Sequence, residues 1–343
     1  MKHIAKWGII GLGNIAYHFA ESFYNLDNAK LVAVASNSKE KLLRFKENFN
    51  IKNENLYDDY EKILDDRNLD VIYIALPNSL HFKWALKAVD KKKNILVEKP
   101  AFTSTNQVEE IFNHKNFESI FFSEGYMYKY HPQIIEMIKI IRSGEIGKPL
   151  QMQTNCGMNL IYKKNFFGFM KKKIHKDKRI FNKNLDGGVI FDLGCYTSSI
   201  SLMIASLIGN LNLSNFSLQD IKTKYLNKNI DVHSFAKINF DNKFISKVTT
   251  SFTEDIGNNT LIECEGGKIE IENSWNPKSS IMKILGNNKK NLEFNNSHNL
   301  YSLEIKNISN DIISNKTEAS FPGTNKNDIL LNTKIINNWI NET

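Results

Sequence analysis

Apolar positions in the first 125 residues alternate between short continuous runs and helical spacing. Residues 3–10 form a β-rich run, and the apolar positions after it, Ala16, Phe19, Ala20 and Phe23, recur at helical spacing. The same alternation continues along this part of the chain. It predicts strands at residues 31–35, 70–76, 94–97 and 119–123, and helices at residues 39–48, 57–65 and 80–91. Strands that alternate with helices are typical of a parallel, doubly wound sheet.

The pattern changes after about residue 150. Residues 151–157 are extended, and residues 190–208 predict a helix. Strands then follow one another at residues 231–240, 243–252, 260–265, 268–272 and 281–285. Turn signals such as Asp241-Asn242 and Gly266-Gly267 leave no room for crossover helices between these strands. The second sheet is therefore predicted to be large and mainly antiparallel.

The chain length of 343 residues is typical of two domains. We expect residues 1–123 to form an α/β domain with a doubly wound parallel sheet, and residues 124–343 to form an α+β domain with the antiparallel sheet. Helices predicted at residues 300–313 and 328–340 close the chain. The pattern leaves open on which domain the helix at residues 328–340 packs.

Composition excludes a disordered or fibrous chain, because 41% of the residues are hydrophobic and 24% are charged. The three cysteines, Cys156, Cys195 and Cys264, show neither a CxxC motif nor the spacing of a zinc site, so we expect no metal and a reducing compartment. No uninterrupted apolar run approaches 18 residues, and Lys6 and Gly8 interrupt the amino-terminal run. These features predict a cytoplasmic protein with no membrane partner.

The positive charge is concentrated in one segment. The chain carries a net charge of +8, and residues 163–179, with eight Lys or Arg and one Asp, account for +7. The rest of the chain is nearly neutral. Nucleic acid is not expected as a partner, because the segment is short and no recognisable nucleic-acid module accompanies it.

A glycine-rich turn, GLGNIA at residues 11–16, joins the first predicted strand to the first helix. Gly11 suits the tight turn and Gly13 the close approach of a pyrophosphate, while the backbone at Asn14 and Ile15 opens the helix that would bind it. Its position after a strand and before a helix predicts a Rossmann-type dinucleotide-binding domain. The alternative is a tight turn without a ligand.

The end of the second strand indicates the type of dinucleotide. The acid that binds the ribose hydroxyls of NAD is replaced here by Ser36-Asn37-Ser38, with Lys39 and Lys41 nearby. We therefore expect NADP to be preferred, with NAD possible, and Ser36 and Lys41 to contact the 2′-phosphate. The alternative is that these lysines form the solvated face of the next helix.

Two more motifs lie at the carboxyl ends of predicted strands: ALPNSLH at residues 75–81 and VEKP at residues 97–100. We expect Pro77, Asn78, His81 and Glu98 to bind the cofactor, although His81 is alternatively a contact at the start of the helix and Glu98 is equally compatible with a surface acid. The order of GLGNIA, ALPNSLH and VEKP resembles the Gfo/Idh/MocA family of NAD(P)-dependent oxidoreductases. EGYMYKYHP at residues 124–132 and GGVIFDLGCY at residues 187–196 extend the resemblance across residues 8–200.

The resemblance implies site residues. Lys99 corresponds to the catalytic lysine, which also binds cofactor and substrate, and Asp192 and Tyr196 correspond to the acid and the proton carrier. Many family members have histidine at the position of Tyr196, and tyrosine there resembles the subgroup with glucose-fructose oxidoreductase, dihydrodiol dehydrogenase and NADP-dependent xylose dehydrogenases. Arg179 matches an arginine frequent in the family and is expected to contact the substrate. A cis peptide bond is implied before Pro100.

The residue chemistry agrees with these roles. Asp192 and Tyr196 are four residues apart at the start of a predicted helix, so they share one face and can both contact the substrate. A lysine ammonium beside a phenol favours its ionised form, so Lys99 is expected to lower the pKa of Tyr196. Tyr196 is alternatively a half-buried core residue.

Two further residues are assigned more loosely. Tyr126 is expected to contact the substrate, although aromatic residues at such positions are often core residues. His131 is expected to be a packing residue rather than a base.

We therefore predict an enzyme that transfers a hydride between NADP or NAD and a carbinol or carbonyl of a sugar, polyol or dihydrodiol. The alternatives are a sugar-nucleotide dehydrogenase of surface-polysaccharide synthesis and a non-catalytic NAD(P)-sensing regulator on the same fold. The basic segment 163–179 is either a solvated loop, a dimer contact through Phe166, Phe167 and Phe169, or a clamp for an anionic substrate. The expected assembly is a homodimer or homotetramer.

Overall fold

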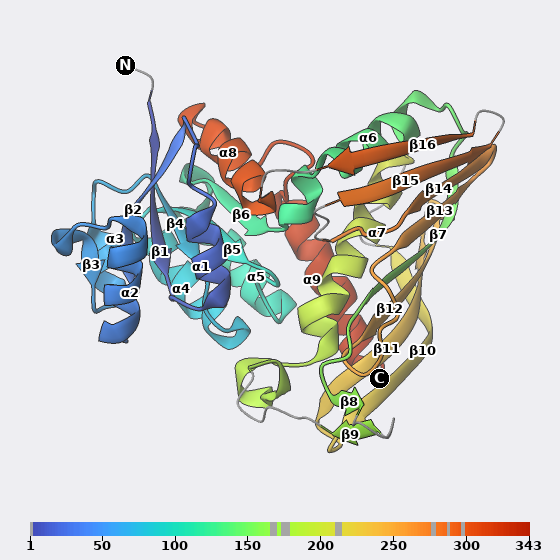
Figure 1. Cartoon of the computed structure of the whole chain (residues 1–343), viewed down its shortest axis with the longest axis horizontal. Helices are drawn as coiled ribbons and strands as arrows, with labels where there is room; N and C mark the ends of the chain where they lie inside the picture. The colour runs from blue at the N-terminus through green and yellow to red at the C-terminus, as the bar shows by residue number, and fades with distance from the viewer. Residues whose placement is uncertain are drawn as a thin grey trace. The chain divides into compact units, whose positions relative to one another are not determined.

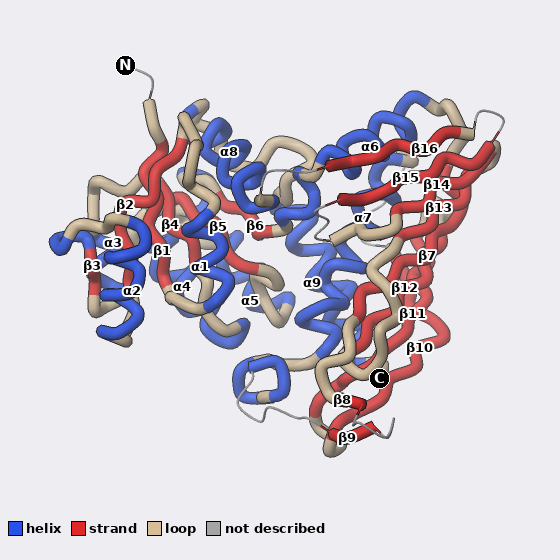
Figure 2. The backbone as a smooth tube through the Cα atoms, viewed as in Figure 1, coloured by secondary structure: helices blue, strands red, loops and turns tan. Residues whose placement is uncertain are grey.

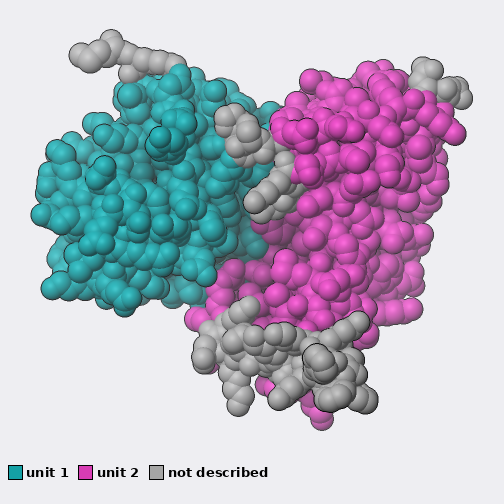
Figure 3. All heavy atoms as spheres, viewed as in Figure 1, with its two compact units in different colours: residues 1–130, 298–330 teal, residues 131–297, 331–343 magenta. Residues whose placement is uncertain are grey.

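The computed structural model describes residues 3–164, 170–172, 179–209, 215–275, 279–286, 289–295 and 299–343, with only the backbone described for residues 163–164 and 170–172. The chain divides into two units, shown in different colours in Figure 3. Unit 1 comprises residues 1–130 and 298–330, and unit 2 comprises residues 131–297 and 331–343. Most of the basic segment predicted at residues 163–179 lies outside the described residues.

Unit 1 is built on a parallel sheet with the strand order β3-β2-β1-β4-β5-β6. Its strands are β1 (Ala5–Ile10), β2 (Ala29–Ala35), β3 (Leu56–Tyr57), β4 (Val71–Ile74), β5 (Asn94–Glu98) and β6 (Phe122–Gly125). Its helices are α1 (Asn14–Glu21), α2 (Lys39–Phe49), α3 (Tyr60–Asp65), α4 (Asn78–Asp90), α5 (Thr105–Phe112) and α8 (Leu300–Ile313). The order reverses between β1 and β4, which is where doubly wound sheets bind ligands.

Helices cover both faces of this sheet (Figure 1). One buried cluster joins the sheet to α1, α2 and α8, with Phe19, Phe45 and Ile308 in its centre. The other joins the sheet to α3, α4 and α5 through residues such as Ala85 and Ile111. With both faces covered, the strands are apolar along their length, as a buried parallel sheet requires.

Helix α8 belongs to unit 1 although it follows unit 2 in the sequence. The indole Nε1 of Trp7 donates a hydrogen bond to Ser309 Oγ at 2.9 Å. The side-chain amide of Asn28 donates to the backbone oxygen of Lys306 and to Asn310 Oδ1, each at 2.8 Å. Residues 298–330 therefore complete the first unit.

The division of the chain differs from the boundary predicted at residue 123. Strand β6 continues to Gly125, where it pairs with Glu98 of β5, so residues 124–125 are part of the first sheet. A short 3₁₀ helix, Met127–Tyr130, packs against α8 and extends the unit to residue 130. The prediction also assigned residues 298–330 to the second domain, whereas the structure places them in unit 1.

Unit 2 contains a mixed sheet with the order β10-β11-β12-β7-β13-β14-β15-β16 (Figure 2). These strands are β7 (Pro149–Gly157), β10 (Phe216–Leu226), β11 (Ile230–Phe240), β12 (Ile245–Ser251), β13 (Thr260–Cys264), β14 (Gly267–Ile271), β15 (Ser279–Gly286) and β16 (Lys290–Asn295). Every pair is antiparallel except β12 with β7. A separate hairpin pairs β8 (Tyr162–Lys164) with β9 (Met170–Lys172). The two predicted sheet types are both confirmed.

The helices of unit 2 are α6 (Pro132–Ser143), α7 (Cys195–Leu207) and most of α9 (Lys326–Asn341). Within the described residues, the helical stretch Lys183–Leu207 is long and apolar enough to cross a membrane, with a mean hydropathy of 1.4, but 89% of its apolar window is buried. Such burial is typical of a core helix. From Leu331 onward α9 packs in unit 2, where Trp339 Nε1 donates to Ser234 Oγ at 2.8 Å.

Candidate functional site

The glycine turn lies between β1 and α1 in unit 1. Gly11 has a φ of +88°, and a Cβ built there would lie 2.7 Å from the backbone oxygen of Ala75. Gly13 is the N-cap of α1, and a Cβ there would meet no atom within 4 Å. Asn14 and Ile15 begin the helix and are exposed, with 38% of Ile15 accessible, whereas Ala16 is fully buried against the sheet. The turn therefore combines one sterically required glycine with open space at the next one.

In the segment after β2, two serine side chains accept hydrogen bonds from backbone N–H groups that follow them. Ser36 is 4% exposed, and its Oγ accepts a hydrogen bond from the Ser38 N–H at 3.1 Å. Ser38 is the N-cap of α2, and its Oγ accepts from the Lys41 N–H at 3.4 Å. Lys41 itself is exposed. The Ser36 hydroxyl keeps its proton for donation, because in this bond it serves as the acceptor.

His81 is buried near the start of α4, where its ring lies against backbone oxygens on two sides. The ring is 1% exposed, and its Nδ1 and Nε2 lie 2.8 Å from Pro100 O and 2.7 Å from Leu76 O, respectively. Both ring nitrogens are thus occupied by the backbone of unit 1. Pro77 and Asn78 are the N-cap and the first residue of α4, which begins before the helix predicted at residues 80–91.

Glu98 and Lys99 end β5. The Glu98 side chain is 8% exposed, accepts a hydrogen bond from the Tyr73 hydroxyl, and accepts another from the Lys99 N–H at 3.2 Å. The interpretation of Glu98 as a surface acid is therefore wrong. Lys99 is half-buried, and the bond between Lys99 and Pro100 is cis, as the family resemblance implies.

Tyr126 lies in a buried polar cluster of unit 1. Its side chain is 1% exposed, packs edge-on to Tyr128 at 6.0 Å between ring centroids, and bonds to the Glu124 carboxyl. The Lys129 ammonium lies 5.6 Å from the centre of the same ring. Its predicted substrate contact remains untested, and these contacts are typical of a core residue.

Asp192 and Tyr196 lie in unit 2 on consecutive turns. Residues Ile190–Gly194 form a π-helical turn that leads directly into α7, and π-helical turns are frequent at functional sites. Arg179 Nη2 lies 3.0 Å from Asp192 Oδ1, so the two predicted substrate residues form an ion pair. The Tyr196 ring is 5.6 Å from that of Trp275, whose Nε1 donates to Asn155 O at 2.8 Å.

The π-helical turn is held by a residue that the sequence analysis missed. Asp231, on β11, accepts a hydrogen bond from the Ile190 N–H at 2.7 Å, and burial raises its pKa. Gly188 has a φ of +129°, and a Cβ there would lie 2.1 Å from Asp231 Oδ1. The Gly187-Gly188 pair was visible in the sequence, but its partner lies 41 residues away along the chain. The signal for Asp231 in the sequence was an acidic residue in a predicted strand with alternating apolar positions.

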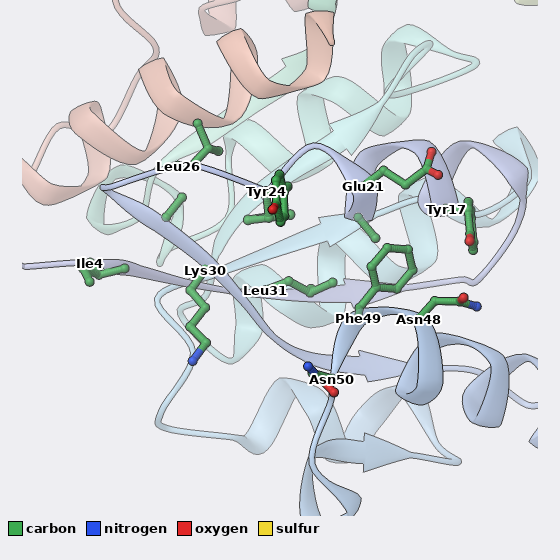
Figure 4. A pocket seen from close by; sticks show the side chains of 13 residues that line it. Ile4, Tyr17, Glu21, Tyr24, Leu26, Lys30, Leu31, Asn48, Phe49 and Asn50 are labelled. Carbon is green, nitrogen blue, oxygen red and sulfur yellow. The ribbon is translucent and has the colours of Figure 1, made fainter. Parts of the chain in front are cut away.

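Metal-binding groups and clefts among the described residues can be compared with these sites. Among the residues that the structure describes, no group of three or more His, Cys, Asp or Glu side chains could hold a metal ion. The cleft in Figure 4, of about 650 Å³, is lined by the end of α1, the beginning of β2 and the end of α2. In that view Glu21 and Lys30 point away from each other. This cleft lies at the amino end of β2, whereas the glycine turn follows the carboxyl end of β1.

The comparison with known families identifies the class of protein. Residues 5–125 match the model of an oxidoreductase family with an NAD-binding Rossmann fold, GFO_IDH_MocA. The part of unit 1 formed by residues 5–125 is thus similar to the NAD-binding domain of this oxidoreductase family. The resemblance to the Gfo/Idh/MocA family that the motifs carry is confirmed for residues 5–125, the part of the chain that the family model matches.

Individual relatives are distant. The D-xylose 1-dehydrogenase (NADP(+)) 2 of Haloferax volcanii is 23% identical over 270 residues, which are 79% of this chain and 76% of that protein. The trans-1,2-dihydrobenzene-1,2-diol dehydrogenase of Xenopus tropicalis is 28% identical over 201 residues, which are 58% of this chain and 56% of that protein. The chain spans about half the length of several curated relatives that it matches.

A solved structure shows the same fold over nearly the whole chain. The aldose-aldose oxidoreductase from Caulobacter crescentus, complexed with glycerol, superposes with a TM-score of 0.84 at 19% identity. The superposition covers 99% of this chain and 97% of that one. Both units therefore have the fold of this relative.

The residues of the glycine turn fit a nicotinamide dinucleotide. Gly13 leaves open space, and no side chain caps the first turn of α1, so its backbone N–H groups can bind a pyrophosphate. The buried Ser36 hydroxyl after β2 can donate to an anionic group. The donor set of unit 1 therefore matches the chemistry of the cofactor that the family binds.

Proposed function

We propose that this protein is an NAD(P)-dependent oxidoreductase that transfers a hydride between the nicotinamide and a carbinol or carbonyl of a sugar, polyol or dihydrodiol. The observation that carries the proposal is the open glycine turn in a unit whose sequence matches the NAD-binding oxidoreductase family. The substrate class follows the names of the curated relatives, which include a D-xylose dehydrogenase and a dihydrobenzenediol dehydrogenase.

The cofactor would be held by the chain's own backbone and hydroxyl groups. The N–H groups that open α1 would bind the pyrophosphate, with Gly13 allowing its close approach. Pro77 and Asn78 begin α4 and Glu98 ends β5, at the carboxyl edge of the sheet, where the rest of the cofactor would lie. When bound, the nicotinamide supplies or accepts the hydride.

NADP is the proposed preference. Residues 36–38 contain no acid that would repel a 2′-phosphate, and the Ser36 hydroxyl and the exposed Lys41 can contact one. Two of the relatives' names specify NADP. This preference predicts that NADPH binds more tightly than NADH.

Lys99 and Tyr196 have complementary proposed roles. A half-buried ammonium such as that of Lys99 can bind the substrate oxygen and stabilise negative charge that develops on it. Oxidation of a carbinol requires the hydroxyl proton to leave with the hydride, and the Tyr196 phenol can accept it. In the reductive direction the same phenol donates the proton.

Asp192 has a proposed role in orienting the substrate. Its carboxylate is paired with Arg179, and a paired carboxylate still has acceptor positions for substrate hydroxyls. Arg179, 37% exposed, can donate to the same substrate. Together they would fix which hydroxyl group reaches Tyr196.

The test uses Lys99→Ala and Tyr196→Phe. Both variants should bind NADPH as the native protein does, measured by fluorescence titration with NADPH and NADH. Turnover should fall by more than about 100-fold, because each variant removes a group that acts directly in the reaction. The substrate panel contains aldoses, polyols, trans-dihydrodiols and sugar nucleotides.

Two matched substitutions serve as controls. Lys91→Ala removes a surface lysine that pairs with Asp65, and Tyr225→Phe removes an exposed hydroxyl that contacts Thr343. Both should retain native turnover. Undiminished turnover in Lys99→Ala and Tyr196→Phe would contradict the assigned roles, and failure of NADPH and NADH to bind would contradict the proposed function.

A further inference from the structure

The segment that follows β5 is bonded at three consecutive residues to buried ionisable side chains. The Lys99 N–H donates to Glu98 Oε2 at 3.2 Å, and the Ala101 N–H donates to Glu124 Oε1 at 2.8 Å. Between them, Pro100 O lies 2.8 Å from Nδ1 of His81. The three side chains are between 1% and 8% exposed. Burying several ionisable groups around one short loop costs free energy unless each group is hydrogen-bonded.

His81 connects this loop to a second strand exit. Its Nε2 lies 2.7 Å from Leu76 O, in the turn between β4 and α4. Carbonyl oxygens only accept hydrogen bonds, so the ring donates to both when both of its nitrogens carry protons and to one of them in either neutral form. The ring thus fixes the distance between the ends of two adjacent strands.

Glu124 holds the loop from the other side. It lies on β6, paired with Val97 of β5, and is 4% exposed. Its carboxyl also bonds to the Tyr126 hydroxyl and interacts with the charges of Lys129 and Asp328. A carboxyl fixed by several partners presents its oxygen to the Ala101 N–H in one orientation.

We propose that His81 and Glu124 are positioning residues for Lys99. Each bonds to backbone directly after the lysine, at Pro100 and Ala101, and together they hold the peptide on which the ammonium depends for its direction. Neither is assigned a contact with substrate. The inference rests on the proposed function only in that Lys99 is taken as the group being positioned.

The direct test is amide hydrogen exchange at Ala101. Glu124→Ala removes the acceptor of its N–H, so exchange at Ala101 should accelerate. Glu124→Gln keeps a carbonyl oxygen in the same place and should leave exchange near the native rate. This measurement requires no substrate, so it reports on the loop whether or not the proposed reaction occurs.

The kinetic test compares kcat with cofactor binding. His81→Leu and Glu124→Ala should lower kcat by about 10–100-fold, the usual effect of a small displacement of a catalytic group. NADPH binding should stay close to native, and Glu124→Gln should retain most of kcat. The control is His114→Leu, which removes another histidine of unit 1 that contacts backbone, at Asn116, and it should leave kcat unchanged.

A double-mutant cycle separates positioning from general destabilisation. If His81 acts through Lys99, His81→Leu should reduce turnover much less in a Lys99→Ala background than in the native protein. Equal effects in both backgrounds would overturn the proposal, as would native exchange at Ala101 in Glu124→Ala. Accelerated exchange in a protein without any turnover would instead support the loop assignment and contradict the proposed function.

If His81→Leu or Glu124→Ala fails to fold, the conservative substitutions His81→Gln and Glu124→Gln still test the proposal. His81→Gln keeps one donor and should give a kcat between those of the native protein and Lys99→Ala. A Glu124→Gln protein that folds with native stability but loses kcat as severely as Lys99→Ala would contradict the proposed acceptor role.

Discussion

At the residue scale, the two glycines of the turn serve different purposes. Gly11 has a left-handed backbone and backbone atoms of Ala75 against it, whereas Gly13 has extended backbone and open space. The first glycine is required by the fold. The second leaves room for a ligand.

This difference gives a pair of predictions that serve as controls for each other. Gly11→Ala should lower the free energy of unfolding by about 1–3 kcal/mol, because an L side chain is strained at this φ and meets the Ala75 oxygen. Gly13→Ala should cost less than about 1 kcal/mol and should nevertheless weaken NADPH binding strongly. Urea unfolding and fluorescence titration measure the two effects. Native NADPH affinity in Gly13→Ala would show that the pyrophosphate does not approach this position.

The sequence predicts which side chains carry chemistry, but it does not always indicate what those side chains contact. Lys99 and Pro77 lie at strand and helix ends because their motifs include the strand ends themselves. His81 is in the expected turn of α4, yet both its nitrogens face backbone oxygens, and no local pattern encodes the path of residue 100. Asp231 was missed for the same reason, since its partner Ile190 is distant in sequence.

At the element scale, the strands that the sequence analysis missed are those with little buried surface. Strand β10 buries only Leu218, and no residue of β16 is buried. Both lie at the edges of the large sheet, where one side of the strand has no neighbour. Without alternating apolar residues, such strands are defined by their pairing partners. Strand β3, two residues long, overlaps at Tyr57 with the helix predicted at residues 57–65.

The cap that Asp231 supplies to the π-helical turn can be tested. Asp231→Ala should lower the free energy of unfolding by about 1–2 kcal/mol, as expected for loss of a helix-capping acceptor. It should also lower turnover, because Asp192 and Tyr196 follow directly from the capped turn. Asp231→Asn keeps an acceptor oxygen and should preserve both properties. Urea unfolding and turnover assays on Asp231→Ala and Asp231→Asn measure these effects. Equal stability and equal turnover in the two variants would contradict the capping role of Asp231.

At the scale of the whole molecule, Glu124 of unit 1 and His131 of unit 2 make stability depend on pH in opposite directions. In unit 1, burial raises the pKa of Glu124 from 4.5 to about 7. The fold thus favours its protonated form, and this contribution to stability is lost as pH rises from 4.5 through 7. In unit 2, burial lowers the pKa of His131 from 6.5 to about 4. Its contribution is present above pH 6.5 and is lost as pH falls toward 4.

Glu124→Gln isolates the first of these effects. The substitution removes the cost of ionisation, so its stability relative to the native protein should increase by about 2–3 kcal/mol between about pH 5 and about pH 8. Urea unfolding at the two pH values measures this difference. His131→Asn, which keeps a good N-cap residue for α6, should show no such increase. If the free energy of unfolding of Glu124→Gln differed from that of the native protein by the same amount at both pH values, the raised pKa of the buried Glu124 carboxyl would be contradicted.

The division into units was the part of the architecture least accessible from sequence. The two sheet types followed from periodicity, but the packing of α8 on the first sheet depends on side chains of Trp7 and Asn28 meeting residues about 280–300 positions later. Amphipathic helices carry no indication of which sheet they cover, and the predicted boundary at residue 123 reflects that ambiguity.

The return of α8 to the first sheet affects how this protein can be divided and recombined. A fragment ending at residue 125, the extent of the family match, would leave Trp7, Phe19 and Ile9 without their cover from α8. Such a fragment should be insoluble or partly unfolded, whereas a chimera that exchanges cofactor modules must transplant two stretches of gene together. A recombination event that exchanges only one of those stretches would leave this face of the sheet with a cover whose side chains were not matched to it.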